Sequence, residues 1–122
     1  MKALNFEGKK MKTKILLLLF IAIAVGATLM ILKAREMSAD KENKLGNAYY
    51  SGKGVPQSYA KAVYWYKKSA AQGDAIAEDN LGYAYYYGKG EPQSYSKAVY
   101  WFKKSAAQGN DVGEKNLSIL EK

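Results

Sequence analysis

The sequence predicts an all-α protein: a short α/α superhelical solenoid of antiparallel helix pairs, preceded by an N-terminal transmembrane or signal helix. Two features carry this prediction, an uncharged stretch of 18 residues at 15–32 and a close repeat in the rest of the 122-residue chain. Residues 45–73 align with residues 81–109 at an offset of 36, and 24 of these 29 aligned positions are identical. A repeat of this period is typical of stacked helical hairpins, in which each unit covers the apolar face of its neighbour.

The uncharged stretch is long enough to cross a membrane. As a helix it would reach about 27 Å at about 1.5 Å per residue, close to the thickness of a hydrocarbon core. Before it, five lysines oppose the single acid Glu7, and this positive flank predicts that the N-terminus stays in the cytoplasm while the rest is exported. We therefore expect residues 1–34 to be a signal-anchor or a signal peptide, with the apolar span at 15–32.

This segment is compatible with an uncleaved anchor and with a cleaved signal peptide. A third explanation, which involves no membrane, is a helix buried in the protein core. Its length and the following Lys33 and Arg35 favour an uncleaved anchor, whereas small residues at Ala22 and Ala24 would suit a signal peptidase. Met11 is an alternative start that would leave a short basic leader. No cysteine follows the apolar stretch, and this excludes a lipoprotein anchor.

The amino-acid composition excludes several classes of function. The chain has no His and no Cys, which excludes thiol catalysis, disulfides, thiolate or imidazole metal sites and a Ser-His-Asp triad. We expect no cofactor and no bound metal. The net charge of +8 divides into +4 for residues 1–32 (five Lys, one Glu) and +4 for residues 33–122 (14 Lys plus Arg, 10 acids). Half of the basic excess therefore belongs to the export segment, and no nucleic-acid partner is predicted.

Each repeat is expected to form two helices. In the second copy the first helix is predicted to begin after the N-cap Asp74 and to end at Gly88, whose backbone freedom suits a helix C-terminus. The second helix follows the cap Ser94 and runs to about Ala107. Ser58 caps the corresponding helix of the first copy. Helices of this length, joined by short turns, would pack as antiparallel neighbours.

The repeat domain is expected to cover residues 38–122. Repeat 1 is placed at about 38–73, repeat 2 at about 74–109 and a partial capping helix at 110–122. The polar residues 38–44 replace the alanines that open repeat 2 and are expected to face solvent as a terminal cap.

Small and aromatic residues indicate how the helices pack. Gly46 and Gly82 lie inside predicted helices, where glycine costs about 1 kcal/mol against alanine, so a neighbouring helix is expected to approach them closely. The aromatic residues expected to fill the space between layers are Trp65, Tyr66, Trp101 and Phe102.

These residues resemble the Sel-one-like repeat family, relatives of tetratricopeptide repeats with a unit of about 36 residues. The resemblance covers about residues 38–120, and Glu91 departs from it by replacing a usual valine. The first copy matches from Leu45 to Gly73. In the second copy the matching residues are Ala75, Ala77, Leu81, Gly82, Tyr85, Gly88, Gly90, Lys97, Ala98, Trp101, Phe102, Ala106, Ala107 and Gly109.

The resemblance implies a protein–protein interaction module that is not an enzyme. Some bacterial members with a signal sequence look like periplasmic immunity proteins, so an immunity-type protein that neutralises a toxin is the alternative. The implied location is the bacterial cell envelope. The repeat domain would be anchored in the inner membrane and face the periplasm, or be soluble in the periplasm or secreted if the signal is cleaved. Cysteine-rich members are linked to β-lactam binding, and the absence of Cys argues against that branch.

The partner-binding residues are expected on the first helix of each pair, which lines the concave side in this kind of solenoid. Tyrosine offers a large contact area with a polar tip, which suits an interface, although packing between helices is an alternative role for Tyr83 and Tyr86. The tyrosines and tryptophans are also compatible with a carbohydrate-binding module, which is a further alternative. The predicted contact residues, on the stripe opposite the packing side, are Asn43, Asn47, Tyr50, Asp79, Tyr83, Tyr86, Lys115 and Ile119.

An enzymatic function finds little support in the remaining residues. The glycine pairs at 52–54 and 88–90 lack the spacing of a phosphate-binding loop. The acids lie at predicted helix starts, where they complement the helix dipole. These acids are Asp74, Glu78, Asp79, Asp111 and Glu114.

Overall fold

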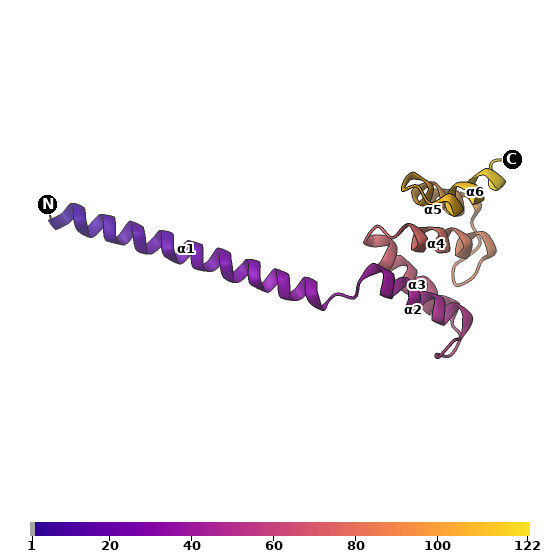
Figure 1. The fold of residues 1–122 in the computed structure, drawn as a ribbon, viewed down its shortest axis with the longest axis horizontal. Helices are drawn as coiled ribbons and strands as arrows, with labels where there is room; N and C mark the ends of the chain where they lie inside the picture. The colour runs from indigo at the N-terminus through magenta and orange to yellow at the C-terminus, as the bar shows by residue number, and fades with distance from the viewer. Residues whose placement is uncertain (1) are drawn as a thin grey trace. The chain divides into compact units, whose positions relative to one another are not determined.

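The computed structural model describes the backbone of residues 2–122 and the side chains of residues 7–33 and 36–122, and this part of the chain contains helices and no strand. The all-helical class predicted from the sequence is confirmed. The chain divides into two compact units, Met1–Glu36 and Met37–Lys122. The helices are α1 (Lys2–Arg35), α2 (Ala39–Ser51), α3 (Tyr59–Ala71), α4 (Ala75–Tyr87), α5 (Tyr95–Ala107) and α6 (Asp111–Leu120), as Figure 1 shows.

The first unit is the helix α1. From Glu7 to Lys33 this helix is long and apolar enough to cross a membrane, and none of its side chains in the apolar window is buried. Phe20 and Met30 leave 74% and 76% of their surfaces exposed, which argues against a buried core helix. A signal sequence passes the same test of length and composition, so an anchor and a cleaved signal both fit this helix.

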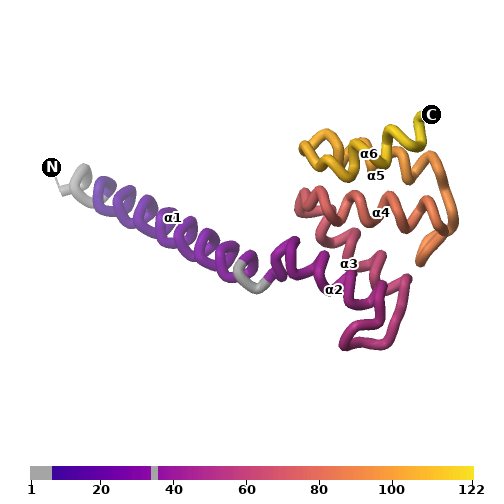
Figure 2. The backbone as a smooth tube through the Cα atoms, turned by 45° about the vertical axis from the view of Figure 1, so that its right-hand side comes forward, coloured from indigo at the N-terminus to yellow at the C-terminus, as the bar shows by residue number. Residues whose placement is uncertain are grey.

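The second unit is a stack of five helices. Figure 2 shows α2 to α6 following one another in sequence order, with α2 and α3 at one end and α5 and α6 at the other. The helices α2, α4 and α6 are the first helices of successive repeat units, and α3 and α5 are the second helices. Each pair is closed by a turn that contains glycines with positive φ, such as Gly52 at 73° and Gly88 at 65°. The solenoid of helix pairs predicted from the repeat is confirmed.

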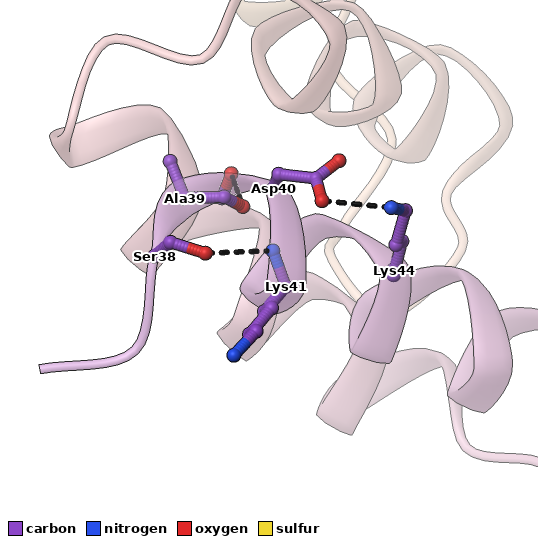
Figure 3. A network of polar contacts seen from close by, with 6 residues as sticks. Ser38, Ala39, Asp40, Lys41 and Lys44 are labelled. Atoms are coloured by element: carbon purple, nitrogen blue, oxygen red, sulfur yellow. Dashed lines mark hydrogen bonds and ion pairs between the residues drawn. The ribbon is translucent and has the colours of Figure 1, made fainter.

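Capping side chains fix where the helices begin. Asp74 accepts hydrogen bonds from the backbone N–H groups of Ile76 and Ala77 at 2.8 and 3.1 Å, which sets the start of α4 where the sequence predicts it. At the start of α2, the Ser38 hydroxyl accepts from the backbone N–H of Lys41 at 3.5 Å (Figure 3).

Figure 3 also shows that the first turn of α2 carries an ion pair, between Lys44 Nζ and Asp40 at 2.7 Å. The polar segment 38–44 does not face solvent throughout, because Glu42 and Asn43 are 3% and 5% exposed. The expectation of a solvent-facing cap is therefore wrong for these two residues. Packing of α2 against its neighbours buries them, and hydrogen bonds to other helices satisfy their side chains.

The two glycines inside helices lie where an aromatic ring presses on the helix backbone. A Cβ added to Gly46 would lie 2.5 Å from Cε1 of Tyr66, and one added to Gly82 would lie 2.5 Å from Cδ1 of Phe102. Both rings come from the second helix of the same repeat and are buried. The close approach expected from the sequence therefore occurs, and the glycines permit it.

We expected all four aromatic residues to fill the space between helix layers, and the two tryptophans do so only in part. Tyr66 and Phe102 are 3% and 2% exposed, whereas Trp65 and Trp101 are only half-buried. Each tryptophan precedes a buried ring by one position, and a step of one residue turns a helical side chain by about 100° towards the surface. Trp101 still packs against the core around Leu81.

Repeated polar contacts join each helix pair. Ser69 Oγ donates to the carbonyl of Ala39 at 2.7 Å, and one repeat later Ser105 Oγ donates to the carbonyl of Ala75 at 2.7 Å. Both serines are fully buried, and their hydroxyls hold the first turn of the preceding helix. No buried side-chain nitrogen or oxygen in the described part of the chain lacks a hydrogen-bond partner.

Candidate protein-binding face

Two adjacent depressions lie on the first helices of the repeat units. One, of about 170 Å³, is lined by Asn47, Tyr50, Tyr66, Asn80 and Tyr83 from α2, α3 and α4. The other, also of about 170 Å³, is lined by residues of α4, α5 and α6: Tyr83, Tyr86, Tyr87, Phe102, Asn116, Ile119 and Leu120. Tyr83 lines both, so the two depressions adjoin. We call the residues that line them the tyrosine face.

Asparagine side chains join α2 to α4 beneath the first depression. Asn80 Nδ2 donates to Oδ1 of Asn43 at 2.9 Å and to Oδ1 of Asn47 at 3.3 Å. The hydroxyl of Tyr66 donates to the same Oδ1 of Asn47 at 2.8 Å. These bonds hold Asn47 in one orientation, so the floor of the depression is ordered before any partner binds.

A related arrangement lies one repeat later between α4 and α6. Asn116 Nδ2 donates to Oδ1 of Asp79 at 2.9 Å, and Asn116 Oδ1 accepts from the hydroxyl of Tyr83 at 3.0 Å. Asn116 and Asn80 occupy equivalent positions, 36 residues apart. The asparagine amide therefore donates to the equivalent residue of the preceding first helix in both repeats. The bond from Tyr66 has no counterpart, because Phe102 at the equivalent position lacks a hydroxyl.

A cluster of tyrosine rings forms the rim of the face. Tyr86 makes edge-on contacts with Tyr87 and Tyr95, at centroid distances of 4.8 and 5.3 Å. Tyr83 stacks on Tyr87 at 6.2 Å, and Tyr50 meets Tyr59 edge-on at 5.0 Å. Each ring restricts the rotamers of its neighbours, which lowers the entropic cost of presenting them to a partner.

Two phenols of the face, those of Tyr66 and Tyr50, stay protonated at physiological pH. Burial, with a smaller contribution from Tyr50, raises the pKa of Tyr66 to about 12. Burial, followed by the nearby Tyr59 and Tyr87, raises the pKa of Tyr50 above its ordinary value. Both hydroxyls are therefore neutral donors and acceptors.

Five of the eight predicted contact residues line the depressions, namely Asn47, Tyr50, Tyr83, Tyr86 and Ile119. Asn43 and Asp79 correct the expectation of an exposed stripe, because each is 5% exposed and bonded to an asparagine of the next unit. Lys115 is exposed but lines neither depression. Contact with a partner stays a prediction for all of these residues.

Asp79 keeps a carboxylate where repeat 1 has the amide of Asn43. Burial raises the pKa of Asp79 above its ordinary value of 3.8, and the hydrogen bond from Asn116 opposes this only in part. The folded state thus holds the proton more tightly than the unfolded state. The contribution of Asp79 is most favourable below pH 3.8 and is lost as pH rises from 3.8 through the raised folded pKa.

We expect Asp79→Asn to be more stable than the parent protein at pH 7, because the amide can still accept from Asn116 and carries no buried charge. The difference in free energy of unfolding should shrink as the pH falls towards 3.8. Urea unfolding of both proteins at several pH values measures it, since every other carboxylate is common to the two. An unfolding difference that does not vary with pH would contradict this account of Asp79.

Among the residues that the structure describes, no group of three or more Asp and Glu side chains lies close enough to hold a metal ion.

The family model of the Sel1 repeat matches residues 42–74 and 75–110, which together make up more than half of the chain. The chain belongs to the Sel1 repeat family. This confirms the resemblance to Sel-one-like repeats. Sel1 repeat proteins are generally non-catalytic scaffolds that bind other proteins.

Three solved structures resemble this Sel1 repeat protein. A Sel1 repeat protein from Oxalobacter formigenes is 48% identical, with a TM-score of 0.58 over 58% of this chain and 54% of that chain. A protective antigen of uropathogenic Escherichia coli strains, which displays an SLR fold, is 44% identical, with a TM-score of 0.63 over 64% and 17%. Helicobacter pylori cysteine rich protein B is 30% identical, with a TM-score of 0.62 over 65% and 59%.

The chain spans about half the length of the first of these relatives and about a sixth of the second. Comparison with curated proteins finds no match.

Sequence reasoning missed several residues of the tyrosine face. Asn80 and Asn116 are identical at an offset of 36 and polar inside helices, and that signal could have found them. Tyr66 and Phe102 were expected only as packing residues, yet each also lines a depression. Their second role depends on the gap between adjacent first helices, which no local pattern reveals.

Proposed function

We propose that this Sel1 repeat protein binds a partner protein or peptide through the tyrosine face, on the side formed by α2, α4 and α6. The observation that carries the proposal is the pair of adjoining depressions, of about 170 Å³ each, that share Tyr83. Each is large enough for a side chain of the partner and too small for a whole cofactor. The general role of the family in protein–protein interaction supports the same conclusion.

The character of the face supports an extended partner segment. The depressions recur once per repeat, so successive side chains of a segment running across α2, α4 and α6 would enter them in turn. Tyrosine hydroxyls and the free surfaces of Tyr50 and Tyr87, which are 37% and 58% exposed, would supply hydrogen bonds and ring contacts. The inter-helix asparagine bonds keep this surface rigid, which reduces the cost of binding.

The test is the double variant Tyr83→Ala/Tyr86→Ala, with affinity measured by calorimetry against a partner isolated from envelope extract. Loss of two central aromatic contacts should weaken binding by about 30-fold or more, which corresponds to about 2 kcal/mol. The control is Tyr64→Ala/Tyr100→Ala, which removes two tyrosines of α3 and α5 that are 55% and 54% exposed.

Circular dichroism must show that both double variants stay folded, because Tyr83 also contacts Phe102 and Asn116. Unchanged affinity in the folded Tyr83/Tyr86 variant, or an equal loss in the control, would refute the proposed face. If Tyr83 proves necessary for folding, Tyr86→Ala alone decides the question. The identity of the partner would also separate an adaptor from a protein that neutralises a toxin.

We further propose that α1 is an uncleaved anchor in the inner membrane of a bacterial cell and that the repeat unit faces the periplasm. The uncharged stretch 15–32 within the candidate span Glu7–Lys33 and the excess of basic residues before that stretch support this topology. Mass spectrometry of the native protein should find the sequence intact from Met1 or Met11. A mature N-terminus near Thr28 would show instead that the segment is a cleaved signal.

A further inference from the structure

The exposed side chains of the second helices are rich in lysine and tyrosine and include no acid. In α3 the exposed side chains are Ala60, Lys61, Tyr64, Lys67, Lys68 and Ala71, and the equivalent residues of α5 are exposed in the same way. Neither helix contains an Asp or Glu. We call these exposed residues of α3 and α5 the lysine face.

Each of these helices presents the same lysine–aromatic cluster. Lys68 Nζ lies 5.2 Å from the ring centroid of Trp65 and 5.6 Å from that of Tyr64. In α5, Lys104 Nζ lies 5.2 Å from Trp101 and 5.7 Å from Tyr100. The two rings of each cluster meet edge-on at 5.1 Å.

Lys68 and Lys104 differ from the neighbouring lysines in what they contact. Lys67 pairs with Glu91, and Lys103 lies 3.6 Å from Glu121. No carboxylate in the described part of the chain lies within ion-pair distance of Lys68 or Lys104, so no acid there pairs with either ammonium group.

Uncompensated lysines beside half-exposed Trp and exposed Tyr match the chemistry of a membrane–water interface. The ammonium groups attract anionic headgroups, and the amphipathic rings favour the boundary between headgroups and acyl chains. An acidic protein would have to place both acids and apolar groups against four rings spread over two helices, whereas a bilayer presents anionic headgroups above an apolar layer at every point of its surface. The charge pattern therefore favours an anionic lipid surface.

Because α1 directly precedes the repeat unit in the chain, a bilayer that holds α1 would lie close to this unit. The candidate membrane span ends at Lys33 and α2 begins at Ala39, so five residues separate the span from the first helix of the repeat unit. A unit on so short a tether experiences a high local concentration of lipid when α1 is inserted, and weak contacts then suffice for docking.

We infer that the lysine face docks on an anionic phospholipid surface through the Tyr64–Trp65–Lys68 and Tyr100–Trp101–Lys104 clusters. This goes beyond the partner-binding proposal, because it uses the second helices and leaves the tyrosine face free. Docking would hold the repeat unit against the bilayer and present the tyrosine face to a partner.

The two tryptophans of the chain, Trp65 and Trp101, both lie in these clusters and report on docking directly. The full chain is reconstituted into vesicles of phosphatidylcholine alone or of phosphatidylcholine with phosphatidylglycerol, each containing brominated lipid that quenches tryptophan at close range. We expect stronger quenching in the anionic vesicles, and added salt should weaken it. Equal quenching in both vesicles, or none in the anionic vesicles, would overturn the inference.

The variant Lys68→Gln/Lys104→Gln should lower the docked-to-free ratio in anionic vesicles by about fivefold for each lysine. Lys68→Arg/Lys104→Arg should restore docking, and Lys41→Gln/Lys53→Gln, which removes the same charge from elsewhere on the unit, should leave it unchanged. Equal quenching of the parent and the Lys68/Lys104 glutamine variant would overturn the inference. Calorimetric affinity for the protein partner, measured without lipid, keeps a failure here distinct from a failure of the tyrosine face.

Discussion

Leu81→Ala is expected to destabilise the repeat unit by about 2–5 kcal/mol, because Leu81 is fully buried and truncation leaves a cavity. Leu81 lies at the centre of the core cluster that joins α3 to α4, where it packs with Ala62, Val63 and Tyr66. For a unit of this size, such a loss should lower Tm by roughly 10 °C or more. Urea unfolding followed by tryptophan fluorescence gives the change in free energy.

The same leucine recurs at both ends of the stack and provides matched controls. Leu45 of α2 and Leu117 of α6 are each half-buried, because each terminal helix lacks one neighbour. Leu45→Ala and Leu117→Ala should therefore cost clearly less than Leu81→Ala. Equal losses at all three positions would mean that the repeat does not stack around α4.

Gly82→Ala is expected to cost about 2 kcal/mol, despite the better helix propensity of alanine. The added Cβ would meet the ring of Phe102, 2.5 Å from Cδ1 and 2.8 Å from Cζ. Phe102 is 2% exposed and packs in the core, so either its ring must shift towards the depression that it lines or α4 and α5 must separate. Thermal unfolding of the variant measures the loss.

Two further variants check that the contact with Phe102 is the cause. Ser118 occupies the position of Gly82 in α6 and is exposed, so Ser118→Ala should have little effect. In a Phe102→Ala background, Gly82→Ala should be nearly neutral or favourable. If the effects of Gly82→Ala and Phe102→Ala simply add, the cost arises elsewhere.

Much of the fold follows from short-range signals in the sequence. The offset of 36, the caps Asp74 and Ser94 and the turn glycines place the helices of the repeat unit close to where the structure has them. Gly82 also predicts that a neighbouring helix approaches closely, and the ring of Phe102 makes that contact. These features are local or strictly periodic, so they can be read without knowledge of the three-dimensional structure.

The parts that sequence reasoning missed depend on contacts between helices that are distant in the chain. Asn43 and Asp79 were placed on an exposed stripe, yet Asn80 and Asn116 from the following unit cover them. Trp65, expected in the core, reaches only half burial. Helical periodicity defines a face of one helix, but the next repeat decides whether that face stays open.

The most direct test of the central claim is site-specific photo-crosslinking in intact cells, with a photoreactive phenylalanine derivative at position 86 or at position 100. Both positions carry a tyrosine, one on the tyrosine face and the other on the lysine face. We predict a discrete protein adduct from position 86 and none from position 100. A protein adduct from position 100, with none from position 86, would contradict the assignment of the partner to the tyrosine face.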